Sequence, residues 1–271
     1  MMKQLAVFVG AVALSLSVSS ASADDHKYTL KDLKALIDSK SYQEVMQHLD
    51  DVAPSERKQE WIDLAGTAVA GYLADAEDGE KLGLLVSVEK QYPALIKSSA
   101  YTKARLDAIP KAFSACYEQA SSRYGGESER LKGFDKCIEI GQKFINSEPG
   151  NAALPLAIAR ATGKTSFPYK ALGLWKTAIT AAGKSSATVC KEDAIARGVI
   201  NALYFASGKL LTETNEVATI CWATVKAPLM ADLKKSESDS FNISACALAS
   251  AQKDYGKADA AACADVPKPK K

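Results

Sequence analysis

The sequence has little of what nucleic-acid-binding, membrane-spanning or metal-binding proteins need. Its 34 basic and 32 acidic side chains leave a net charge of only +2, too little for a basic nucleic-acid-binding surface. Beyond residues 1–23, no apolar run approaches the roughly 18 residues that cross a bilayer. His26 and His48 are the only histidines, and no C-x-x-C motif occurs. We therefore expect no nucleic-acid partner, no transmembrane segment in the mature chain, no metal and no cofactor.

Motifs of catalysis are missing as well. The segments 162–165 and 182–185 end like a P-loop, but neither has the earlier glycine that a P-loop requires. His48 lies on a short helix rich in carboxylates and carboxamides, which indicates a surface histidine rather than a general base. We therefore expect a protein without enzymatic activity. The alternative is a helical cell-wall glycoside hydrolase that uses a buried glutamate.

The first 23 residues have the parts of a removable export signal. Lys3 supplies a positive charge, an apolar stretch follows, and Ala21-Ser22-Ala23 is a small-x-small cleavage pattern. The chain as a whole is 47% apolar and 24% charged, a globular composition. We expect cleavage after Ala23 and a periplasmic protein, with secretion further outward as the alternative.

All six cysteines lie in the mature part, and an even number in an exported chain predicts three disulfides. Each successive pair is spaced to link two neighbouring antiparallel helices, which favours sequential pairing. A Cys221–Cys246 bond is the competing possibility. The predicted pairs are Cys116 with Cys137, Cys190 with Cys221, and Cys246 with Cys263.

Apolar residues recur at every third and fourth position along nearly the whole chain, which predicts an all-α fold. Thr29 with Asp32, and Ser41 with Glu44 in an S-x-x-E capping box, are placed to begin two short helices. Left-handed C-terminal caps are expected at Gly150, Gly163, Gly183 and Gly208. Later helices are expected over 61–73, 82–92, 106–117 with a bend at Pro110, 128–146, 151–162, 168–182, 186–206, 213–226 and 238–253.

One stretch carries a repeat-like pattern of aromatic, small and aliphatic residues. It comprises Gly133-Phe134, Cys137-Ile138, Phe144-Ile145, Pro149 and Asn151-Ala152. This stretch resembles the second helix and following turn of a tetratricopeptide repeat, and advancing by that family's 34-residue period takes Cys137-Ile138 to Ala171-Leu172. The resemblance covers about residues 128–185. It implies stacked helical hairpins, a TPR-like α-solenoid, with a concave protein-binding face, whereas an irregular helical bundle is the alternative.

Four regions follow from these patterns, with a boundary at Gly125-Gly126. They are the signal peptide (1–23), an N-terminal helical region (24–124), a TPR-like, disulfide-stapled helical region (125–264) and a basic tail (265–271).

The resemblance also implies a binding face on the helix over 151–163. In that family, the face that carries Leu156, Arg160 and Lys164 lines the groove, whereas Pro155, Ile158 and Ala159 face neighbouring helices. An apolar floor at Leu156 and two cations one turn apart favour an extended peptide that bears a carboxylate. Alternatively, the two cations only satisfy the last carbonyls of a helix that ends at Gly163.

The sequence thus predicts a non-catalytic, exported scaffold or binding module of the cell envelope. Its expected partner there is a protein or a peptide, whose identity the sequence does not give.

Overall fold

The computed structural model describes residues 28–122, 126–205, 208–264 and 266. The expected export signal and residues 267–271 of the basic tail lie outside the described residues. Within the described ranges every regular element is a helix, so the predicted all-α fold is confirmed there.

The α-helices cover most of the described chain and are joined by short links. They are α1 Leu30–Asp38, α2 Tyr42–His48, α3 Gln59–Asp75, α4 Asp78–Gln91, α5 Ser99–Ser121, α6 Gly126–Ser147, α7 Ala153–Gly163, α8 Leu172–Ala182, α9 Ser186–Val189, α10 Asp193–Phe205, α11 Gly208–Ile220, α12 Trp222–Leu233, α13 Asp239–Ser250 and α14 Lys257–Ala262. Shorter 3-10 helices are η1 Leu49–Asp51, η2 Pro54–Glu56, η3 Pro93–Lys97, η4 Pro168–Ala171 and η5 Gly183–Ser185.

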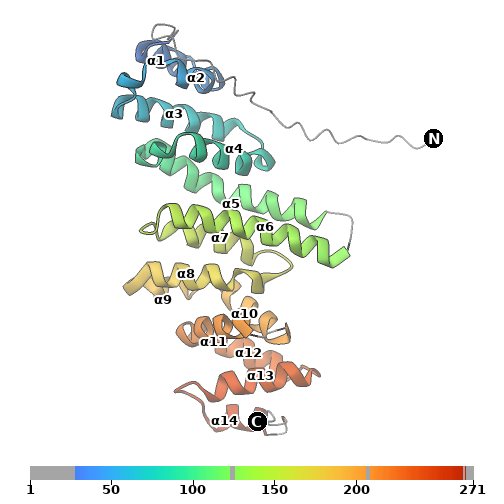
Figure 1. The fold of residues 1–271 in the computed structure, drawn as a ribbon. Helices are drawn as coiled ribbons and strands as arrows, with labels where there is room; N and C mark the ends of the chain where they lie inside the picture. The colour runs from blue at the N-terminus through green and yellow to red at the C-terminus, as the bar shows by residue number, and fades with distance from the viewer. Residues whose placement is uncertain (1–27, 123–125, 206–207, 265, 267–271) are drawn as a thin grey trace, which may run out of the picture.

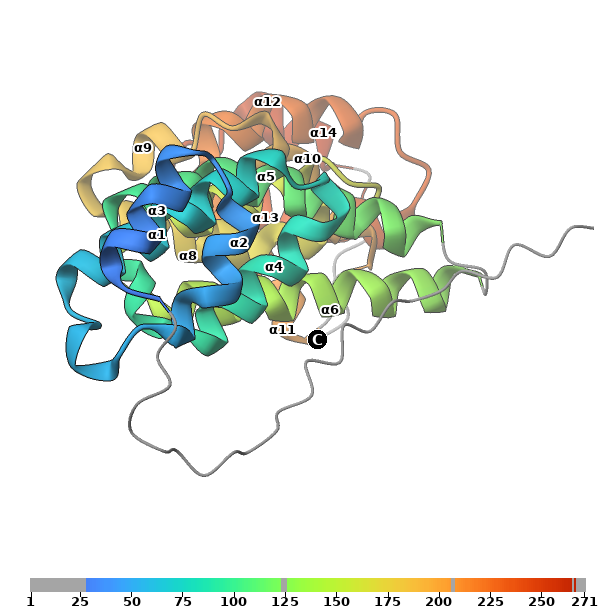
Figure 2. The ribbon, with the colours of Figure 1, turned by 90° about the horizontal axis from the view of Figure 1, so that it is seen from above.

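The helices stack in chain order along one axis, from α1 at one end to α14 at the other (Figure 1). Helix α3 packs on α5, α5 on α7, and α10 on α12. Seen along the stack in Figure 2, α5, α10 and α12 lie on one side, and α4, α6 and α11 lie on the other. One hydrophobic core runs through the whole stack, from Leu33 to Leu248. Each helix therefore buries its apolar stripe against its neighbours in the stack.

Of the two predicted helix caps at the N-terminal end, one is confirmed and one is wrong. Asp32 accepts a hydrogen bond from the Thr29 backbone at 2.9 Å, and the Thr29 hydroxyl accepts one from the Asp32 backbone, which completes a capping box. Ser41 makes no such bond, because its backbone is not extended as a cap requires (φ −79°, ψ 55°). Its hydroxyl lies 3.1 Å from that of Ser39 instead.

The glycines expected as left-handed caps differ in what they do. Gly183 follows α8 with a positive φ of 52°. Gly150 has no positive φ, Gly208 begins a helix rather than ending one, and Gly163 is the last residue of α7. A Cβ at Gly163 would lie 2.9 Å from the Cβ of Ala194, so this glycine permits the close approach of α7 and α10.

All three predicted disulfides are confirmed: Cys116–Cys137, Cys190–Cys221 and Cys246–Cys263. The Cys190–Cys221 bond lies where two predicted helices, 186–206 and 213–226, are wrong. The first is split into α9 and α10 at Cys190, and the second into α11 and α12 at Cys221. The bond brings these two breaks to a Cα–Cα distance of 5.0 Å, and the Thr224 hydroxyl donates to the Cys190 carbonyl, which α9 leaves free. The apolar period continues across both breaks, so periodicity alone does not reveal them.

Gly66 of α3 is a position where one methyl group is expected to destabilise the protein. A Cβ there would overlap the hydroxyl and Cβ of Ser98, the residue that caps α5. We expect Gly66→Ala to lower the free energy of unfolding by about 1–3 kcal/mol, measured by urea denaturation. Gly83 in α4 is the matched control, because a Cβ there meets nothing within 4 Å. Gly83→Ala is expected to stabilise by up to about 1 kcal/mol, and equal effects of the two substitutions would refute this packing argument.

Candidate functional site

A groove runs along one face of α5. It consists of three adjoining hollows of about 280, 310 and 500 Å³. Lys111 lines both the first and the second, whereas Ser114, Glu118 and Lys164 line both the second and the third. The hollows therefore adjoin one another along α5. Together we call them the α5 groove, which begins between α3 and α5 and ends at the loop after α7.

Small side chains of α5 form most of the floor of the groove. The floor residues are spaced alternately by four and three positions, so they share one face of the helix. They are Ala104, Ala108, Lys111, Ala115, Glu118 and Ser122. From residue 104 to residue 122 this face extends over about 27 Å, which matches about eight residues of extended chain.

The charges that line the groove alternate in sign along α5. Asp107, Lys111 and Glu118 are exposed and make no hydrogen bond or ion pair with the described residues. Next to them, the Lys81 ammonium lies 2.6 Å from Asp78, and this hydrogen bond lowers the pKa of the Asp78 carboxyl below its ordinary value. The unpaired charges can bind a ligand of mixed charge.

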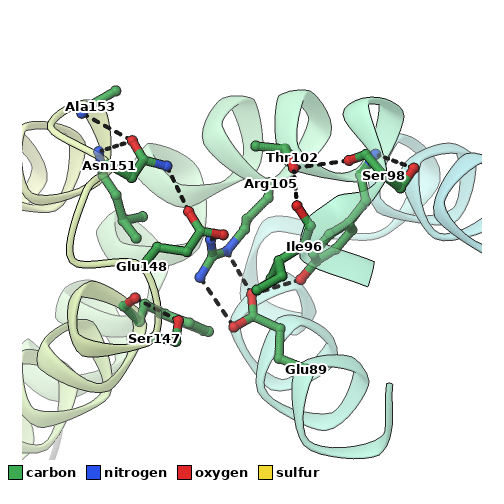
Figure 3. A network of polar contacts seen from close by, with 12 residues as sticks. Glu89, Ile96, Ser98, Thr102, Arg105, Ser147, Glu148, Asn151 and Ala153 are labelled. Atoms are coloured by element: carbon green, nitrogen blue, oxygen red, sulfur yellow. Dashed lines mark hydrogen bonds and ion pairs between the residues drawn. The ribbon is translucent and has the colours of Figure 1, made fainter. Parts of the chain in front are cut away.

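A buried ion cluster fixes the helices that form the groove walls, and Figure 3 shows it at Arg105 of α5. The Arg105 side chain is fully buried between Glu89 of α4 and Glu148, the residue after α6. Its Nε lies 2.6 Å from Glu89 Oε1, its Nη2 donates to Glu89 Oε2, and its Nη1 donates to Glu148 at 2.7 Å. Arg105 therefore ties α5 to α4 on one side and to the end of α6 on the other.

The same cluster continues to the start of α7. Asn151 donates its side-chain amide to Glu148 at 2.7 Å, and its Oδ1 accepts the backbone N–H groups of Ala153 and Leu154. Asn151 thus caps α7 while it is held by the carboxylate that binds Arg105 (Figure 3). A second buried contact joins α5 to α7, with 2.6 Å between the hydroxyls of Tyr117 and Thr162. The groove lies between helices whose relative positions are fixed.

Glu89 gives this cluster a predictable pH dependence. Burial raises the pKa of the Glu89 carboxyl above its ordinary value of 4.5, against the opposing effect of the Tyr101 hydroxyl and Arg105. As the pH rises from about 4.5, the Glu89 carboxyl loses its proton in the unfolded chain before it does so in the folded chain. The contribution of Glu89 to the free energy of unfolding therefore falls. We expect the stability of the wild type relative to Glu89→Gln to decrease from pH 4.5 to 7.5 in urea denaturation. An increase over that range indicates a lowered pKa and contradicts the prediction.

The three residues predicted to bind a peptide do not come together. Lys164 lines the groove. Arg160 is directed to the residue before α10, with its Nε and Nη2 donating to Glu192 at 3.0 and 2.6 Å. Leu156 is partly buried against the core. Pro155, Ile158 and Ala159 are buried as expected. A binding role for Leu156 and Arg160 stays a prediction.

Two partly buried carboxylates of the kind that a glycoside hydrolase needs are present, but both pair with an arginine. Glu89 and Glu148 face each other across Arg105, which neutralises them. Neither carboxylate lines the α5 groove, where a sugar chain could reach it. Glu89 and Glu148 therefore do not form a pair of carboxylates that faces this groove.

The groove residues of α5 escaped the sequence analysis, although a signal for them exists. The stripe of alanine, serine, lysine and glutamate from 104 to 122 has strict helical spacing. Such a stripe on a long helix resembles an ordinary solvated face, and only packing against α3, α4 and α7 makes it concave.

Comparisons with protein-family models, with curated proteins and with solved structures give no match to this chain. Within the described ranges, no helix is long and apolar enough to cross a membrane. The same ranges hold no cluster of three or more histidine, cysteine or acidic side chains that could bind a metal ion.

Proposed function

We propose that this protein is a non-catalytic, exported binding module that holds an extended protein segment in the α5 groove. The observation that carries the proposal is the succession of three adjoining hollows along α5, which share lining residues. A groove about eight extended residues long lets a backbone approach closely where its lining consists of alanine and serine side chains. We further propose that the helical stack is a TPR-like solenoid and that α3, α5 and α7 form its concave side.

The lining of the groove supports a peptide rather than an apolar ligand. Exposed charges of both signs, Asp107, Lys111 and Glu118, are spaced along it, so a segment with both acidic and basic side chains fits best. Lys111 and Lys164 both line the central hollow, where Asp78 is already bound by Lys81. An acidic side chain of the peptide is expected beside these two lysines.

Export is part of the proposal and is supported by two features. Three disulfides persist in an oxidising compartment, and residues 1–23 have the pattern of a cleavable signal. Together they favour the periplasm or a place beyond it as the site of binding.

The groove is tested by charge reversal at its centre. Linear decapeptides are selected from a random display library on the mature protein and then measured against the Lys111→Glu/Lys164→Glu variant. We expect selected peptides to bind this variant at least about tenfold more weakly, because two attractive contacts become repulsive. The matched control is Lys136→Glu/Lys143→Glu, two exposed positions on α6. Equal loss in both variants, or no enriched peptide, would overturn the proposal.

A further inference from the structure

Apart from the α5 groove, a hollow of about 700 Å³ lies at the N-terminal end of the stack. Its walls come from the turn between α1 and α2, from α2 and from the end of α3. We call it the α2–α3 pocket. The side chains that matter for its chemistry are Tyr42, Glu44, Gln47, His48, Tyr72 and Asp75.

The aromatic part of this pocket is held in place by the helix beneath it. A Cβ at Gly71 of α3 would overlap the ring of Tyr42, so the ring lies directly on the α3 backbone because residue 71 has no side chain. Tyr72, the next residue of α3, lines the same hollow. The turn between α1 and α2 is fixed as well, since Lys40 and Ser41 donate their backbone N–H groups to Ile37 and Leu36 at 2.9 and 2.8 Å. The pocket is therefore formed before any ligand binds.

Three polar side chains that line the pocket make no polar contact with the rest of the described chain, whereas its His48 binds Asp51 and stacks on Tyr28. In the part of the chain that the structure describes, the side chains of Glu44, Gln47 and Asp75 make no hydrogen bond or ion pair. Nearby carboxylates behave differently: Asp50 binds Arg57 and Tyr92, and Asp51 binds His48. The free acceptors and donors thus concentrate where the surface is hollowed.

We propose that the α2–α3 pocket binds a neutral saccharide. Hydroxyl groups of a sugar both donate and accept, which suits carboxylates that accept and a carboxamide that does both. The fixed Tyr42 ring offers an apolar face to the C–H face of a pyranose ring. Two carboxylates and one lysine disfavour an anion, and the polar lining disfavours an apolar ligand. This inference is independent of the proposed peptide binding.

The test uses cellotriose, maltotriose and chitotriose as probes, titrated into the mature protein by calorimetry. We expect at least one of them to bind with a Kd of about 1 mM or tighter. At two exposed positions, the variant Gln47→Ala/Asp75→Asn removes the carboxamide of residue 47 and replaces the carboxylate of residue 75, which only accepts, by a neutral carboxamide. It is expected to weaken that binding about tenfold. The control Gln142→Ala/Glu139→Gln, exposed on α6, is expected to leave the affinity unchanged.

Three outcomes would overturn the inference. No heat from any of the three sugars at 10 mM excludes a saccharide site of useful affinity. Binding that the Gln47→Ala/Asp75→Asn variant retains places the sugar elsewhere. Binding of spermidine but of none of the sugars identifies the pocket as a site for an organic cation, held by Glu44 and Asp75.

Discussion

Replacing Arg105 by alanine is expected to lower the free energy of unfolding by about 3–5 kcal/mol. The guanidinium is fully buried and is the shared partner of Glu89 and Glu148, so its removal leaves two partly buried carboxylates without their cation. The loss also removes the ion pairs that link α5 to α4 and to the end of α6. Urea denaturation of the mature protein, followed by circular dichroism, measures the change.

The matched control for Arg105 is Arg197, which is exposed on α10. Arg197→Ala is expected to change the free energy of unfolding by no more than about 0.5 kcal/mol. If Arg105→Ala costs as little as the control, the ion cluster does not fix the groove walls. The second readout is the affinity for a selected peptide at a temperature where the variant is folded, which is expected to fall as the walls loosen.

Removing the central disulfide is expected to have the next largest effect. The bond between Cys190 and Cys221 closes a loop of 31 residues and joins two helix breaks. We expect Cys190→Ala/Cys221→Ala to lower the free energy of unfolding by about 2–4 kcal/mol. Hydrogen exchange is expected to increase first in α9 to α12, where the two breaks meet.

The disulfide near the C-terminal end provides the comparison. The Cys246–Cys263 disulfide closes a loop of only 17 residues. If a disulfide stabilises mainly by restricting the unfolded chain, removing this one lowers the free energy of unfolding less than removing Cys190–Cys221. The predicted order is therefore a larger loss for the Cys190–Cys221 pair. The reverse order would show that the packing around the cysteines, and not loop closure, sets their contribution.

Local features of the fold could be predicted from the sequence because they depend on near neighbours. Helical periodicity, the Thr29 cap and the three cysteine pairs follow from spacings within about one hairpin. Features set by distant residues could not be predicted. Arg105 is one residue of a long helix until Glu148, 43 positions away, is brought beside it.

The candidate site shows the same limit. The prediction put Arg160 and Lys164 on one face from their helical spacing, and in a groove from the resemblance to a tetratricopeptide repeat. The structure pairs Arg160 with Glu192, which lies 32 positions further along the chain, and leaves Lys164 in the groove. Helix spacing tells which side chains share a face, but the neighbouring helices decide which of them stay free.

The central claim is that an extended segment of a partner protein lies in the α5 groove. It is tested most directly by a photo-crosslinking amino acid placed at Ser114, which lines two of the hollows of the groove, in the protein expressed in its own cell. The account predicts that Ser114 crosslinks to one continuous segment of a partner, identified by mass spectrometry, and that the same probe at Glu139 of α6 does not. Identical products from both positions, or a product from Glu139 alone, would contradict it.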